Sequence, residues 1–428
     1  MWKQSVRIST LVLIIVALVS LPMAASTVGG EINGQLAYEW DEDTASAVQT
    51  MTQAGFRLVL EDDLESLGKI HFSTKGHYDF KTSEGEIALD QLYVSGYTAD
   101  VDYIAGRHII SWGTADGFNP TNYFGRMSSG TLTSGDLTGE PIWAGEATYY
   151  APNWAVTGVV VPIFVPQTID EQMRTLLADD PEMEFILGVI DGVKKPERSW
   201  RSAEYGVRAE TNLSGWDVQL SYFTGFEPLP GLRLVTTIDP NTGMPVDFDL
   251  GGEYRRQRFA GIAAAGTVGD VGVWAEMTYG GPTPFEGENP LQVVSPLSVN
   301  KNYVQAVAGA DYTFPVGNGL LAQGQYIYRG NGSLLMPYHD PEQELKAAHY
   351  LYGRLAYDFS LDSTLELIAV HELTDHSGLL MPMYTHRFPN SIQVQAGFLT
   401  SYGTDSEESA GEFSRIPSQA RIGVTYKF

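Results

Sequence analysis

The feature that most constrains the fold is a strict alternation of apolar and polar residues, which recurs along the whole chain. In residues 421–428, Ile422, Val424, Tyr426 and Phe428 fall on one face, and arginine, glycine, threonine and lysine fall on the other. Period-two alternation is the signature of a β-strand. Similar runs occupy 69–80, 202–211, 216–223, 271–279, 303–314 and 392–398. Charged residues within strands, opposite an apolar face with aromatic ends, are typical of a transmembrane β-barrel.

The spacing of the breaks between strands supports this fold class. Short turns are expected at 62–68, 98–100, 151–153, 212–215, 268–270, 315–319, 360–363 and 388–390. Long polar connections alternate with them, at 112–142, 164–201, 226–254, 281–300, 330–345 and 403–417. This asymmetry predicts an all-β, antiparallel transmembrane barrel of about 18 strands, with 16 possible, short periplasmic turns, long outer loops and periplasmic termini. A soluble β-sandwich is the alternative.

The first 25 residues have the layout of a secretory signal peptide. Lys3 and Arg7 precede an apolar run at 11–21, and small residues follow near Ala24 and Ala25. The run is shorter than the roughly 20 apolar residues that a transmembrane helix needs. We therefore expect export to the outer membrane, with residues 26–428 forming a single barrel.

Composition excludes several classes of partner and cofactor. The formal charge is −26, and removing the two basic residues of the signal peptide makes it about −28. Such acidity argues against nucleic-acid binding, which needs a basic surface. The absence of cysteine excludes disulfides and thiolate metal sites. Acidic stretches at 40–46, 239–249 and 403–412 have carboxylates that suit calcium, but they lack EF-hand spacing. We expect solvated loops, with no metal and no cofactor.

Strand parity places a set of charged residues on the face that would line the lumen. The basic members are Arg57, Lys69, His71, Lys75, His77, Arg107, Arg208, Arg354 and Arg421. The acidic members are Asp79, Glu204, Glu210, Asp217, Glu276 and Asp311. Such rows tune selectivity in a channel, although most of them are expected to pair with one another across the wall. Overall acidity favours cations at the mouth, whereas the basic cluster on the third to fifth strands favours anions at the narrowing.

Residues 106–120 mark a change in character. A strand-like run from Arg107 to Trp112 is followed by turn chemistry, in which glycine permits positive φ and proline fixes φ. We expect Trp112 in an interfacial aromatic girdle. The following loop, 113–142, either folds into the lumen as a constriction or stays an ordered extracellular loop.

The connection 164–201 is expected to contain a helical insert. Asp180 is a candidate N-cap and Pro181 suits the first helical position, and apolar residues follow at helical spacing. Residues 168–179 are a candidate second short helix. The insert either plugs or lids the pore, or packs on the rim of the barrel.

Catalysis has one candidate stretch, the sequence HELTDHSG at 371–378. His371 and His376 are five residues apart, whereas the helical zinc-protease motif needs a spacing of four. Ser377, His376 and Asp375 are adjacent and lack a nucleophile elbow. We therefore expect no enzyme activity, and an outer-membrane hydrolase is a remote alternative.

Several of these stretches carry a resemblance to a known family. They are Gly106, Arg107, Trp112, Gly113, Asp116, Asn119 and Pro120, followed by 147–154 and 159–166. Together they resemble a poorly characterised, porin-like family of large Gram-negative-type outer-membrane β-barrel proteins, classed as a domain of unknown function. The last strand, which ends in Phe428, resembles the signal that the barrel-assembly machinery recognises.

The resemblance implies a channel-like barrel without a defined substrate. The sequence thus predicts an outer-membrane channel that passes small-molecule solutes through a charged, polar lumen. The alternative is a closed structural or interaction barrel with no transport. The expected partners are outer-membrane lipids, the assembly machinery and the solutes, and the oligomeric state is left open.

Overall fold

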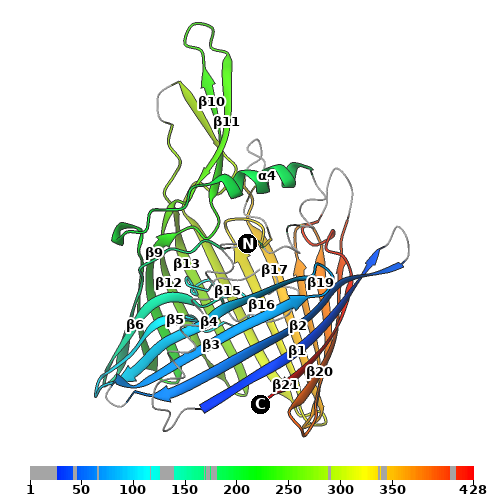
Figure 1. The fold of residues 1–428 in the computed structure, drawn as a ribbon. Helices are drawn as coiled ribbons and strands as arrows, with labels where there is room; N and C mark the ends of the chain where they lie inside the picture. The colour runs from blue at the N-terminus through cyan, green and yellow to red at the C-terminus, as the bar shows by residue number, and fades with distance from the viewer. Residues whose placement is uncertain are drawn as a thin grey trace.

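The computed structural model describes residues 27–41, 46–64, 67–115, 117–125, 139–167, 169, 174, 181–287, 291–335, 338, 345–404 and 411–428. The expected signal peptide and most of the expected second short helix lie outside these residues. The described strands form a closed antiparallel barrel of 18 strands, in which β1 pairs with both β2 and β21 (Figure 1). The predicted fold class and strand number are confirmed.

The first nine wall strands are β1 (Thr27–Asp41), β2 (Ser46–Asp63), β3 (Lys69–Asp79), β4 (Glu84–Tyr97), β5 (Val101–His108), β6 (Ile142–Ala151), β7 (Trp154–Val161), β8 (Glu204–Leu213) and β9 (Trp216–Phe226). The other nine are β12 (Arg256–Val268), β13 (Val271–Pro282), β15 (Tyr303–Phe314), β16 (Leu320–Arg329), β17 (Ala348–Ser360), β18 (Ser363–Glu372), β19 (Gly378–Arg387), β20 (Ile392–Tyr402) and β21 (Gln419–Lys427).

The two ends of the barrel differ as the turn spacing predicted. Each of the eight expected short turns joins two neighbouring wall strands, and these turns lie at one end of the barrel (Figure 1). The long connections lie at the other end. Both termini of the wall belong to the short-turn end, where the backbone N–H of Gly30 donates to the carbonyl of Phe428 at 2.9 Å.

Side chains alternate between the inside and the outside of the wall. In β13, Trp274, Glu276 and Thr278 are buried, whereas Met277 and Tyr279 are exposed. The outward row of this strand is therefore mainly apolar, and the inward row carries polar groups, which is the alternation typical of a transmembrane barrel. Residues directly opposed in the antiparallel register share a face, so the register assigns each lumen candidate to a side.

A small sheet stands above the barrel at the long-loop end (Figure 1). It consists of β10 (Gly231–Ile238), β11 (Pro245–Glu253) and β14 (Gln292–Pro296). The helix α4 (Pro181–Gly192) begins at the predicted proline. Its residues Ile186, Leu187 and Ile190 pack on Leu232 of β10. The described helix of the insert therefore packs on the small sheet at the long-loop end. No helix in the described part of the chain is long and apolar enough to cross a membrane.

A buried ion pair ties the outer connections together. The guanidinium of Arg255 donates to both carboxylate oxygens of Glu227 at 2.7 Å and to Oδ1 of Asn300 at 3.0 Å. It also lies 4.0 Å from the centroid of the Phe285 ring. Burial raises the pKa of the Glu227 carboxyl to about 7, in spite of the adjacent Arg255.

Candidate functional site

Residues 109–115 and 117–125 leave the wall and enter the barrel; we call them the inner segment. The strand β5 ends at His108, so the predicted strand up to Trp112 is too long by four residues. Trp112 is 1% exposed, and its ring packs edge-on against Phe124. The prediction that Trp112 lies in an interfacial aromatic girdle is wrong, because the backbone turns inward after β5 and carries Trp112 into the barrel. The amide of Asn119 donates to the carbonyl of Trp112 at 2.7 Å and holds this turn.

Glu276 on β13 holds the tip of the inner segment, by which we mean Thr114, Ala115 and Thr121. This β13 residue is 2% exposed, and its carboxylate accepts five hydrogen bonds from the segment. Oε1 accepts the N–H of Ala115 at 2.7 Å and both the N–H and the hydroxyl of Thr114. Oε2 accepts the N–H of Thr121 at 3.2 Å and its hydroxyl at 2.7 Å. An ionised carboxylate surrounded by donors is a strong anchor, since charge-assisted hydrogen bonds are about twice as strong as neutral ones.

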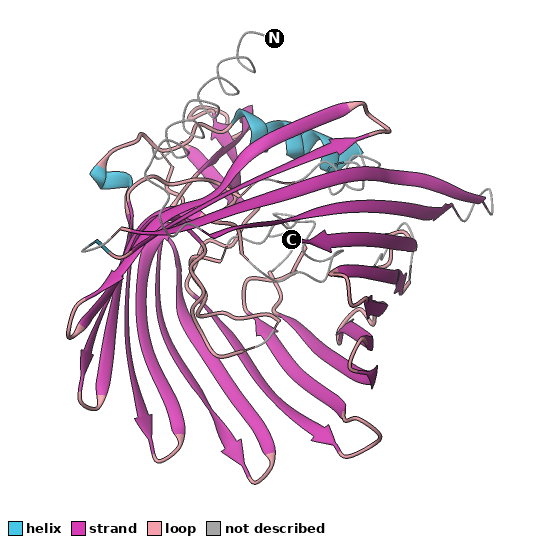
Figure 2. Cartoon of the chain, turned by 60° about the horizontal axis from the view of Figure 1, so that its bottom comes forward, coloured by secondary structure: helices cyan, strands magenta, loops and turns pink. Residues whose placement is uncertain are grey.

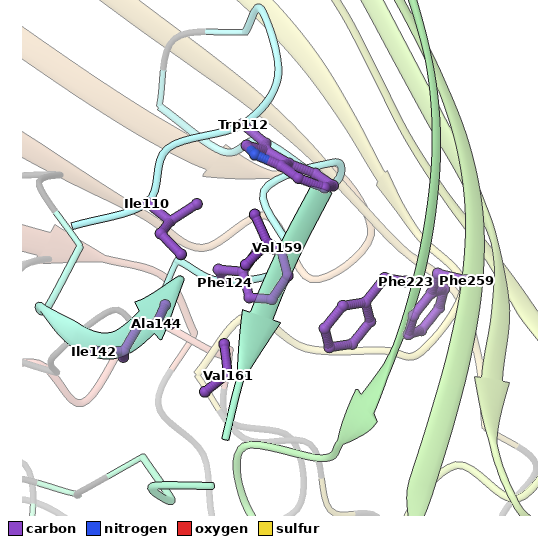
Figure 3. Packing of buried hydrophobic residues seen from close by; sticks show 9 residues of the cluster. All are labelled: Ile110, Trp112, Phe124, Ile142, Ala144, Val159, Val161, Phe223 and Phe259. Carbon is purple, nitrogen blue, oxygen red and sulfur yellow. The ribbon is translucent and has the colours of Figure 1, made fainter. Parts of the chain in front are cut away.

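Apolar contacts hold the two ends of the inner segment against the wall (Figure 3). Ile110, Trp112 and Phe124 form one buried cluster with six residues from β6, β7, β9 and β12: Ile142, Ala144, Val159, Val161, Phe223 and Phe259. Gly206 of β8 makes room for this cluster, because a Cβ atom there would lie 2.8 Å from the Trp112 ring. The Arg208 guanidinium lies 5.3 Å from the centroid of the same ring, within cation–π range.

The inner segment also reaches the far side of the lumen. The amide of Gln325 on β16 donates to the carbonyl of Phe118 at 2.9 Å. Phe118 packs against a second apolar cluster, which includes Ile327 and Tyr350. Loops lie inside the ring of strands in Figure 2. The described residues at the start of this loop, 113–115 and 117–125, therefore lie in the lumen, and residues 126–138 lie outside the described part of the chain.

A second inner segment, residues 411–416, follows β20. Phe413 is buried in the second apolar cluster. The carboxylate of Glu412 accepts hydrogen bonds from the Ser333 hydroxyl at 2.6 Å, the Leu335 N–H at 2.8 Å and the Tyr350 hydroxyl at 2.5 Å. Glu412 thus joins two outer connections to the inner face of β17.

The stretch 371–378 supplies the other side of this contact. Oδ2 of Asp375 accepts the backbone N–H of Glu412 at 2.6 Å, and Oγ of Ser377 accepts the N–H of Phe413 at 3.1 Å. The contact between Ser377 and Asp375 is a backbone N–H to Oδ1, at 2.7 Å, as in a turn. These polar groups therefore position a loop.

A β-bulge places a carboxylate among the basic residues of the third to fifth strands. The register between β3 and β4 shifts at Ser73 and Thr74, and the extra residue is Asp90. Its carboxylate accepts hydrogen bonds from Nη2 of Arg57 at 2.9 Å and from the Ser73 hydroxyl at 3.1 Å. Nζ of Lys75 lies 3.6 Å away. Bulges often redirect a side chain in this way. We call Arg57, Ser73, Lys75 and Asp90 the Asp90 cluster.

Arg107 does not share the inward row. It stands in register with Leu92 and Trp143, and Trp143 is 38% exposed on the outside of the wall. The prediction that Arg107 lines the lumen is therefore wrong. Its side chain lies on the outward row, and its neighbour Gly106 lies on the inward row. Its Nε still reaches the carbonyl of Asp90, at 2.9 Å.

The remaining lumen candidates lie on inward rows, and many are paired. The pairs are His71 with Glu61 at 2.9 Å, Arg208 with Glu210 at 3.3 Å, Arg354 with Glu366, and Arg421 with Gln419. Glu204 accepts the backbone N–H of Phe226 at 3.0 Å. The register places Lys69, His77, Asp79, Asp217 and Asp311 on the same face as these residues. Their part in selectivity stays a prediction.

Sequence reasoning missed Asp90, Glu412 and the inward course of residues 411–416. Asp90 left a signal, because Asp90 and Gln91 interrupt the alternation of β4 with two successive polar residues. The sequence carries no such signal for Glu412, because its partners lie in another outer connection and in β17. No group of three or more histidine or acidic residues in the described parts of the chain is arranged to hold a metal ion.

Comparison with known proteins shows similarity in structure and none in sequence. No protein-family model matches the sequence, and no curated protein is significantly similar to it. The structure is similar to OccAB3 of Acinetobacter baumannii, with a TM-score of 0.51 and 10% identity over 95% of this chain and 100% of that chain. It is similar to the outer membrane protein opdK of Pseudomonas aeruginosa, with a TM-score of 0.51 and 9% identity over 94% and 98%. It is also similar to OccK2 (OpdF) of the same organism in complex with glucuronate, with a TM-score of 0.52 and 8% identity over 94% of this chain and 98% of that chain. These values confirm the large β-barrel fold.

Proposed function

We propose that this protein is an outer-membrane channel that lets small polar solutes diffuse through the part of the lumen beside the inner segment. A barrel of 18 strands has room for an aqueous passage, because barrels of 16–18 strands generally leave one. The structural neighbour that holds glucuronate supports a small polar solute as the class of cargo. The apolar outward rows would face outer-membrane lipids.

The observation that carries the proposal is the anchoring of the inner segment by Glu276. The segment crosses from the β6–β9 side to β13 and β16, and its described contacts do not extend to β1–β4 or β21. On that other side, the side chains of Arg57 and Lys75 remain 37% and 57% exposed. A narrowed lumen with accessible charges on one wall is the arrangement expected of a selective pore.

A closed structural barrel is the second candidate, and one observation favours it. Two apolar clusters lie inside the barrel, and the second inner segment adds Phe413 to one of them. Apolar side chains that meet across a lumen exclude water. A hydrolase has no comparable support, since the polar groups of 371–378 are engaged in loop contacts.

The terminal strand supports assembly by the outer-membrane machinery. In β21, Ile422, Val424 and Tyr426 face outward, and the strand closes the barrel against β1. We infer that this strand, with Phe428 at its end, is the segment that the machinery recognises.

Liposome swelling separates the two candidates. The refolded chain is placed in vesicles, and swelling rates are compared for uncharged sugars of increasing size and for sodium glucuronate. A channel gives rates that fall with solute size. If folded protein, verified by its heat-dependent mobility on gels, gives no swelling with any solute, the closed barrel is the correct reading.

A further inference from the structure

One cavity on the inner wall is not filled by either inner segment. It has a volume of about 120 Å³ and lies where β18–β21 meet β1 and β2. Its lining includes the thioethers of Met51, Met381 and Met383. The amides of Gln395 and Gln419 and the side chain of Arg421 also border it. The cavity therefore combines a polarisable apolar wall with hydrogen-bonding groups.

The methionines share the inward face of the barrel. Met381 is in register with Ile368, a buried residue of β18, and Met51 is in register with Ala37, which is fully buried. Three methionines from two separate strands thus converge, out of 11 in the whole chain. Methionine is flexible and polarisable, so it adapts to ligands of different shape and makes favourable contacts with rings.

The polar groups form a network beside this wall. The side-chain amide of Gln419 donates to the Thr50 hydroxyl at 3.3 Å. The side-chain oxygen of Gln419 accepts a hydrogen bond from Nε of Arg421. That contact holds the Arg421 guanidinium beside Gln419. The amide of Gln395 reaches the Thr385 hydroxyl at 3.3 Å and Sδ of Met383 at 4.0 Å. A positive charge is therefore held in a fixed position beside the thioethers.

The size of the cavity limits the apolar group that it can take. Apolar protein cavities of about 150 Å³ bind benzene. The volume here, about 120 Å³, suits one six-membered ring or a short branched chain. A fully hydroxylated ring of the same size would lose its water without gaining hydrogen bonds from the thioethers.

We propose that this cavity is a solute subsite that selects amphipathic molecules. The apolar group, about one ring in size, lies against Met51, Met381 and Met383, and a hydrogen-bond-accepting head group lies toward Arg421. The inference rests on the proposed channel function and adds to it a preference for solutes with an apolar part.

The test compares two probes with the same carboxylated six-membered ring. Cyclohexanecarboxylate has no hydroxyl groups on its ring, whereas quinate has several. Each is added to the refolded full-length chain in a planar bilayer, and the apparent affinity is measured from the concentration dependence of the current reduction. We expect the wild type to bind cyclohexanecarboxylate about fivefold more tightly than quinate.

Variants locate this preference. The double substitution Met381→Gln and Met383→Gln keeps the side-chain length and removes the apolar wall, so the two probes should bind equally. Met244→Gln is the matched control, since Met244 is 67% exposed in the connection between β10 and β11. It should keep the wild-type preference. If the double variant does not fold, Met51→Gln tests the same wall from β2.

The outcomes separate the subsite from the channel. Equal affinity for both probes in the wild type, or an unchanged preference in the folded methionine variants, overturns the subsite while the channel stands. A folded wild type that conducts no current overturns the proposed channel, and the subsite fails with it.

Discussion

The anchoring of the inner segment by Glu276 makes a specific prediction for Glu276→Gln. The carboxylate accepts five hydrogen bonds, three of them from the backbone N–H groups of Thr114, Ala115 and Thr121. A glutamine keeps one acceptor oxygen and turns an NH₂ group toward backbone donors. At least one buried N–H then loses its acceptor, and the remaining contacts lose their charge.

The size of the effect follows from these losses. An unsatisfied buried donor costs about 1–3 kcal/mol, and the loss of charge assistance adds about 1 kcal/mol. Together these amount to about 3 kcal/mol, or roughly a hundredfold change in the equilibrium between the anchored and the released tip. The apolar contacts of Trp112 and Phe124 remain, so only the tip is released.

Single-channel recording is the assay for this prediction. Glu276→Gln should add openings of larger conductance, or strong current fluctuations, that the wild type lacks. Glu61→Gln is the matched control, because Glu61 is an inward carboxylate that pairs with His71 and does not contact the inner segment. Wild-type conductance and noise in a folded Glu276→Gln channel would show that Glu276 does not hold the tip in place.

Three further predictions concern other carboxylates. Asp90→Asn leaves Arg57 without its ionic partner, so the reversal potential in a salt gradient should shift toward anion selectivity; no shift would mean that the Asp90 cluster is remote from the ion path. Glu412→Gln weakens the contacts to three donors by about 2 kcal/mol, and thermal unfolding followed by circular dichroism should show a lower midpoint. Burial raises the pKa of Glu227 to about 7 from its ordinary 4.5, so between these values the folded outer loops hold a proton that the unfolded chain does not. This contribution to stability is present at pH 5 and lost as the pH rises through about 7. Limited proteolysis should therefore cut the outer connections faster at pH 8, and Glu227→Gln should remove the difference.

The barrel wall could be predicted from the sequence because its signals are local. Alternation within a strand and the turns between strands depend on residues next to one another, and all eight predicted short turns join wall strands. The start of α4 at Pro181 was predictable for the same reason. These features need no knowledge of distant contacts.

The inner segment could not be placed in the same way. Glu276 lies 155–162 residues from the groups that it binds, and nothing in the sequence around Thr114 identifies it as their partner. Trp112 shows the same limit, because an aromatic residue after a strand suits a lipid interface as well as an apolar contact inside the barrel. Asp90 differs, since its bulge interrupts the strand alternation and could have been found.

The proposed channel requires a water-filled passage beside the inner segment. The single-channel conductance of the refolded wild-type chain in a planar bilayer tests it most directly. We expect a stable, ohmic conductance, which increases when Glu276→Gln releases the segment tip. A protein that inserts and folds but conducts no current, both as the wild type and as Glu276→Gln, would contradict the channel and show that the apolar clusters close the barrel.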